Sequence, residues 1–234
     1  MRYVVSLLLV LSGVTAILAD LQRWLPACAG GFDAPECVGM QSDWYDVAPP
    51  GESWIPIGTA APLMGAGYAL MALAVIGLFR TVVPAWRAWG VGTLCAVPFA
   101  VLAATTFASA AAGHTVELAG TTASLHLLAY AWPVALGLLL AGTLASSGLR
   151  AGYIVAAAGL LVLASPLVLY VTAALVTGYV SHDTSPWTQA IGGVFTLLAG
   201  VALLLAGVRS APSDDIPVRR PSTHGPLTPW STIS

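Results

Sequence analysis

Two cysteines near the start of the sequence have a spacing that suits a disulfide bond. Cys28 and Cys37 enclose eight residues, among them the flexible pair Gly30 and Gly31 and the turn-prone Pro35. The spacing is longer than the dithiol motif of redox enzymes, and the surrounding segment lacks the histidine that a metal site would favour. We therefore predict a structural disulfide, which stabilises a loop of this size by about 2 to 3 kcal/mol.

Aromatic and acidic side chains follow the second cysteine and could form a binding surface. Anchoring at a membrane interface is the simpler interpretation, because Trp and Tyr combine an apolar ring face with a polar N–H or O–H group. A surface that binds a ligand is the alternative, provided that several rings converge on one groove. Its candidate residues are Trp44, Tyr45, Asp46, Glu52 and Trp54.

Two histidines and one carboxylate form a second candidate site. His114 ends one apolar block and His126 begins the next, with Glu117 in the connection between them. A hairpin would bring the three together, and imidazole with carboxylate can bind a metal ion; the histidines could also bind haem. Interfacial histidines bonded to water or backbone are the more common arrangement. We therefore predict no cofactor, and keep a metal or haem site here as an alternative.

The elements that must position these residues are membrane helices. Of the 234 residues, 58% are hydrophobic and 8% are charged, whereas soluble domains have roughly 25% charged residues. Apolar blocks of about 20 residues match a hydrocarbon layer of about 30 Å. We predict an all-α integral membrane protein with a bundle of six transmembrane helices, at about residues 4–19, 56–79, 90–112, 124–146, 152–177 and 188–208.

The arginines predict how these helices are oriented. All eight basic residues are Arg, and with a cytoplasmic N-terminus only Arg23 lies in an outer segment. This distribution fits the positive-inside rule. Eight of the ten carboxylates then lie outside. We predict a multi-pass protein of the plasma membrane, the bacterial inner membrane, with both termini cytoplasmic and one long outer loop at 20–55 that the disulfide constrains.

The two ends of the chain carry further predictions. The first apolar block could be a cleaved signal peptide, which would leave five helices, but Ile17 stands where a cleavage site has a small residue. We therefore predict that this helix is retained. Residues 1–208 would form a single transmembrane domain, and residues 209–234, rich in Pro, Ser and Thr, a disordered cytoplasmic tail.

Prolines and small residues within the blocks concern how the helices pack. Interior prolines occur in four blocks, where they either bend helices around a pathway or are tolerated because neighbours satisfy the freed backbone groups. Small residues spaced by four, as at Gly192 with Thr196 and Gly200 and at Gly152 with Ala156, would let helices approach closely. Four uncharged hydroxyl groups lie within the blocks, and we predict that they form hydrogen bonds between helices: those of Thr105, Thr106, Ser165 and Thr172.

The paired cysteines resemble the pair in the first outer loop of bacterial haem A synthases. That resemblance would imply an eight-helix haem protein. This chain lacks the deep histidine pairs of that family and two of its helices, so no residue role is carried over. No nucleotide-binding, nuclease or hydrolase motif is present either, and we expect no nucleic-acid partner.

Three functional hypotheses remain. The leading one is a non-enzymatic accessory or interaction subunit that presents its ordered outer loop to another membrane-protein subunit, with the lipid bilayer as its other partner. The second is a carrier for a neutral or lipid-like solute, which requires a cavity between the helices. The third is a membrane-bound haem or metal protein that uses the outer-face histidines.

Overall fold

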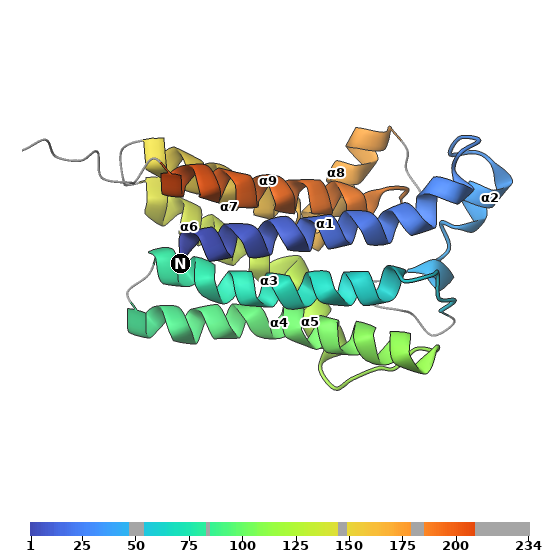
Figure 1. Ribbon diagram of the computed structural model, residues 1–234, viewed down its shortest axis with the longest axis horizontal. Helices are drawn as coiled ribbons and strands as arrows, with labels where there is room; N and C mark the ends of the chain where they lie inside the picture. The colour runs from blue at the N-terminus through green and yellow to red at the C-terminus, as the bar shows by residue number, and fades with distance from the viewer. Residues whose placement is uncertain (47–53, 83–84, 145–148, 179–184, 209–234) are drawn as a thin grey trace, which may run out of the picture.

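A computed structural model describes residues 1–46, 54–82, 85–144, 149–178 and 185–208, and every regular element in these ranges is helical. Figure 1 shows the long helices side by side in one bundle. The elements are α1 (Arg2–Ala27), α2 (Pro35–Gly39), the 3-10 helix η1 (Asp43–Tyr45), α3 (Ala60–Val82), α4 (Ala85–Ala112), α5 (Thr121–His126), the π-helix η2 (Leu127–Ala131), α6 (Trp132–Leu144), α7 (Leu149–Leu163), α8 (Pro166–Thr177) and α9 (Thr188–Val208).

Five of the helical segments are long and apolar enough to cross a membrane, and a sixth span results if α7 and α8 count as one. Large apolar side chains on the outside of the bundle are exposed, among them Leu94, Leu138 and Leu175. Such a surface is unfavourable in water and is suited to lipid. In the described residues the prediction of an all-helical fold is confirmed, with five or six helices long and apolar enough to span a membrane.

The first helix is longer than predicted. α1 continues from the expected end at residue 19 to Ala27, so that Asp20 and Arg23 lie on a helix and not in a loop. Both side chains are buried. The polar side chains that suggested a loop are instead hydrogen-bonded inside the structure. Because hydrogen bonds offset the cost of burying them, the helix can continue through these positions.

A seam of glycines brings α1 against α9, the pair of helices with the most extensive contact. A Cβ atom added at Gly193 would lie 2.7 Å from the Gly13 carbonyl oxygen, and one added at Gly200 would lie 2.7 Å from the Ser6 carbonyl oxygen. The predicted close approach at Gly200 is confirmed. At Gly152 the prediction is wrong, because an added Cβ there would meet nothing within 4 Å.

The block predicted as one span at 152–177 is broken. α7 and α8 meet at an angle of 84°, and Figure 1 shows α8 leaving the direction of the bundle. Pro166 is the first residue of α8, and Ser165 before it has extended backbone angles. Proline disfavours a helical conformation in the preceding residue and cannot donate the hydrogen bond that would continue α7.

The other prolines have smaller effects. Pro98 lies inside the unbroken α4. Pro133 follows η2, a five-residue π-helix between α5 and α6. Because Pro133 has no N–H, the carbonyl four residues before it loses its usual donor, and a local π turn is a common response. Thr105 makes the predicted bond between helices, with Thr121 of α5 at 2.8 Å. For Thr106, Ser165 and Thr172 the prediction is wrong, because each hydroxyl donates to a backbone carbonyl three or four residues earlier in the chain.

Candidate functional site: a cavity beside a broken helix

A cavity of about 260 Å³ lies between the helices, at the break between α7 and α8. It is far larger than the roughly 30 Å³ that one water occupies, and slightly smaller than the sites of drug-sized ligands, about 300 to 1,000 Å³. Its lining comes from α1, α3, α4, α5, η2, α6, α7, α8, α9 and the segment before α9.

The broken helix creates this space. Leu161 at the end of α7 and Ala164 at the break line the cavity, and α8 then turns away by 84°. Pro166 and Tyr170 of α8 line the cavity and are exposed, so they form its rim.

One part of the lining is apolar and aromatic. Phe99 of α4 and Trp132 of α6 contact each other edge to face, with ring centroids 5.4 Å apart. Met64 and Met71 of α3 and Leu128 of η2 line the same cavity. These side chains provide an apolar surface of adaptable shape, because methionine is flexible and polarisable.

The lining also carries polar groups, namely the Gln189 amide and several hydroxyl groups, four of which donate to backbone carbonyls. A hydroxyl that donates its proton keeps lone pairs that can accept a hydrogen bond. The pairs are Ser12 with Gly67 (2.8 Å), Ser165 with Val162 (2.6 Å), Thr188 with Ser185 (2.6 Å) and Thr196 with Gly192 (2.9 Å). Within the described residues, this part of the cavity therefore offers acceptor oxygens.

Ser185 is different from these residues. The residue is 1% exposed and lines the cavity, and within the described ranges of the chain its hydroxyl has no hydrogen-bond partner. A buried polar group without a partner costs about 1 to 3 kcal/mol and is rare in native structures. Trp187, two residues on, has φ of 64°, a conformation that is unusual for a bulky residue. The backbone around Ser185 is thus held in an unfavourable conformation beside the cavity.

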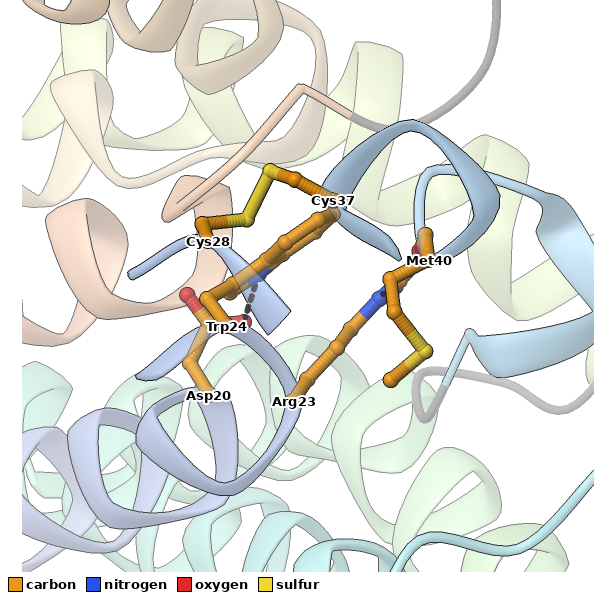
Figure 2. The surroundings of a disulfide bond; sticks show 6 residues. All are labelled: Asp20, Arg23, Trp24, Cys28, Cys37 and Met40. Carbon is orange, nitrogen blue, oxygen red and sulfur yellow. Dashed lines mark hydrogen bonds between the residues drawn. A yellow bond between two sulfur atoms is a disulfide. The ribbon is translucent and has the colours of Figure 1, made fainter. Parts of the chain in front are cut away.

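A second polar cluster lies at one end of the bundle, where α1 meets the segment 28–46, which we call the cap. Cys28 and Cys37 form the predicted disulfide bond. Figure 2 shows the Trp24 ring below this disulfide, with its indole nitrogen directed at Asp20. The Trp24 side chain is fully buried, and its Nε1 donates to Asp20 Oδ1 over 2.8 Å.

Asp20 joins α1 to α9. Its second carboxylate oxygen accepts a hydrogen bond from the backbone N–H of Ala190 over 2.7 Å. Ala190 lies in the first turn of α9, where N–H groups lack partners within the helix and the helix dipole favours negative charge. Asp20 therefore caps a helix that lies 170 positions away in the sequence.

Arg23 holds the cap to α1. Its guanidinium donates to the carbonyl oxygens of Met40 and Ser42 and forms an ion pair with Asp46. The Arg23 side chain is 2% exposed and that of Asp46 is 30% exposed. A planar guanidinium with five N–H donors suits several acceptors at once, which a lysine would not.

The residues of the predicted outer-loop binding surface lie in different environments. Trp44 is 55% exposed, whereas Trp54 is buried at 6%. Tyr45 is half-buried, and Asp46 is engaged by Arg23. Glu52 lies outside the described residues. A ligand surface made from these residues stays a prediction, without a groove at which the rings converge in the part that the structure describes.

The two histidines are exposed, and each contacts nearby backbone. His114 Nδ1 lies 3.1 Å from the Ala112 carbonyl oxygen, and His126 Nδ1 lies 2.8 Å from that of Thr122. Glu117 accepts a bond from the Thr122 hydroxyl at 3.3 Å. Among the described residues, no group of three or more His, Cys, Asp and Glu side chains could hold a metal ion. The metal or haem hypothesis keeps its status as a prediction.

Sequence reasoning missed both the cavity and the buried cluster. Pro166 was a signal for the cavity, because it stands in the middle of an apolar block. The signal for the cluster was the spacing of Asp20, Arg23 and Trp24, which places a carboxylate and an indole one helical turn apart. Comparison of the chain with protein-family models, with curated proteins and with solved structures finds no match.

Proposed function

We propose that this protein binds a small neutral or lipid-like solute in its central cavity and carries it across or along the membrane. The observation that supports this most is the position of the cavity at a helix break, with walls from nearly every helix of the bundle. Broken helices in membrane proteins are tolerated where they line a cavity, and carriers place solute sites there. This puts the carrier hypothesis ahead of the accessory-subunit hypothesis.

The experiment fills the cavity. Ala164 lines it, and Ala164→Leu adds three carbon atoms there. The matched control is Ala104→Leu on the exposed face of α4. Native mass spectrometry of gently purified protein should find a small neutral molecule on the wild type and on the control, and none on Ala164→Leu.

Transport is tested with the molecule so identified. In proteoliposomes, the wild type and Ala104→Leu should carry it, and Ala164→Leu should not. Equal retention by all three proteins, or an empty cavity in the wild type, would refute solute binding at this place. Binding of the molecule without its transport across the proteoliposome membrane would refute the carrier function and leave solute binding standing.

We also propose that both termini lie on the cytoplasmic side of a bacterial inner membrane. Figure 1 shows the N-terminus at the end of the bundle opposite α2. Arg2 is the first residue of α1, and Arg80 lies in the last turn of α3. Seven of the eight arginines fall on that side in the predicted topology. A disulfide in the cap fits an oxidising compartment outside the cytoplasm.

An accessory or interaction subunit is the second candidate, favoured by the ordered cap. Trp44 and Val38 are about half exposed on a segment that a disulfide and Arg23 hold in place. Exposed aromatic residues on an ordered surface are typical of protein interfaces. Crosslinking in native membranes should then capture a second membrane protein, with capture reduced by Trp44→Ala. A chain that runs alone would refute this role.

A further inference from the structure

We infer that the cavity ligand is an uncharged amphiphile whose single hydroxyl or primary amide group meets Ser185 and whose apolar body lies against Phe99 and Trp132. This rests on the proposed binding of a solute in the cavity and names its chemical class. It concerns binding alone, so it holds whether or not the solute is transported.

The lining sets the charge of the ligand. None of the described residues that line the cavity is Asp, Glu, Arg, Lys or His. A charged group placed among these side chains would lose its hydration without an opposite charge to compensate. A carboxylate or ammonium ligand is therefore disfavoured relative to a neutral one of the same size.

Ser185 sets the position of the polar group. Ser185 lines the same cavity, and its buried hydroxyl has no hydrogen-bond partner among the residues that the structure describes. A ligand that accepts a hydrogen bond from this hydroxyl would remove the cost of leaving it unpaired. The Thr188 hydroxyl donates a hydrogen bond to the Ser185 carbonyl, and its lone pairs can accept a hydrogen bond from the ligand. A ligand group that both donates and accepts fits this arrangement.

The other side of the cavity sets the body of the ligand. Phe99, Leu102, Leu128 and Trp132 belong to the buried apolar core and also line the cavity. A polar body would lose hydrogen bonds with water there without regaining them, whereas a hydrocarbon body would be favoured by about 0.8 kcal/mol per buried CH₂. One polar end and one apolar end therefore describe the ligand.

The test uses octanol that carries a photoreactive diazirine, with the full-length protein in lipid nanodiscs. On illumination it should label peptides of α6 and α9. Unlabelled 1-octanol should compete with the label, and octane and octanoate should compete at least tenfold less well. Ser185→Ala should raise the probe concentration that gives half-maximal labelling about tenfold. The loss of one hydrogen bond of about 1.4 kcal/mol weakens binding by that factor.

A control separates this effect from unfolding. Because Ser185 has no partner in the free protein, Ser185→Ala should leave the apparent melting temperature unchanged or raise it. Ser6→Ala, which removes a hydroxyl bonded to the Arg2 carbonyl outside the cavity, should leave labelling unchanged. Octanoate that competes as well as octanol, or labelling that ignores Ser185→Ala in a folded protein, would overturn the inferred ligand class.

The outcomes also separate this inference from the proposed function. Ser185-dependent labelling without transport of any neutral amphiphile would leave the ligand class standing and refute the carrier. Transport that Ala164→Leu abolishes and Ser185→Ala does not affect would leave the carrier standing and overturn the placement of the polar group.

Discussion

At the scale of single residues, Asp20 and Arg23 show how charge can be buried at an acceptable cost. Asp20 is 1% exposed, yet one carboxylate oxygen accepts from Trp24 and the other from the first turn of α9. Arg23 is also 1% exposed and has acceptors in the cap. Each charge is matched by hydrogen bonds, which is the condition under which burial of a charge is tolerated.

Removing the Asp20 carboxylate should destabilise the protein. Asp20→Ala leaves the Trp24 indole N–H and the Ala190 backbone N–H buried without an acceptor, at a cost of about 1 to 3 kcal/mol each. We expect the free energy of unfolding to fall by about 2 to 4 kcal/mol, measured by SDS-induced unfolding in mixed micelles. Asp20→Asn, which keeps one carbonyl oxygen, should lie between wild type and Asp20→Ala.

Asp33→Ala is the control for this prediction, because Asp33 is an exposed carboxylate of the cap. It should unfold as the wild type does. Equal stability of Asp20→Ala and Asp33→Ala would mean that the carboxylate does not hold α1 to α9.

Arginine at position 23 should be required for its geometry and not only for its charge. Arg23→Lys keeps the positive charge but cannot reach Met40, Ser42 and Asp46 with a rigid fork of donors. We expect amide hydrogen exchange in α2 and η1 to become at least tenfold faster, with α3 and α4 unchanged. Exchange in the cap that is equally slow in both proteins would contradict this role.

At the scale of elements, similar sequence patterns give different structures, depending on which neighbouring helices they contact. Gly200 lies against the backbone of α1, whereas Gly152 faces open space, although both belong to small-residue patterns with a spacing of four. Pro98 leaves α4 continuous and Pro166 separates α7 from α8. Neighbouring helices decide these outcomes, because only they can satisfy freed backbone groups or require close approach.

Adding one methyl group at each glycine should have opposite effects. Gly200→Ala places a Cβ 2.7 Å from a backbone oxygen of α1, so the helices must separate, at a cost of about 1 to 3 kcal/mol. Gly152→Ala meets nothing and gains up to about 1 kcal/mol of helix propensity. Thermal unfolding in detergent should show a lower midpoint for the first variant and an equal or higher midpoint for the second. A similar midpoint for both would contradict close packing at the seam.

At the scale of the whole molecule, the two ends of the bundle differ in chemistry. The end with the cap contains the disulfide and the buried ion pair. The opposite end holds Arg2, and Arg80 over the Trp89 ring at 4.4 Å. Arginines concentrated at one end and acidic residues near the other favour a fixed orientation in the membrane.

Thiol labelling should report that orientation and the state of the disulfide together. In intact cells, a membrane-impermeant maleimide should label neither Cys28 nor Cys37 until a reductant that cannot cross the membrane is added, and should then label both. Cys95, the free cysteine, should need a permeant reagent. Labelling of the cap only after lysis would place it in the cytoplasm and refute the proposed topology.

The sequence by itself determined the fold class and the disulfide. Helical spans depend on the hydropathy of consecutive residues, and the cysteine pair is close in the chain, so both are local properties that a single sequence contains. It did not determine where α1 ends, because the reason lies in partners elsewhere: Asp20 bonds to Ala190, and Arg23 bonds to Met40. The tertiary structure alone decided that the Ser185 hydroxyl lacks a partner in the described part of the chain and that a cavity lies beside Pro166. Burial, unsatisfied hydrogen bonds and empty space are relations among residues far apart in sequence, and they exist only once the helices have packed.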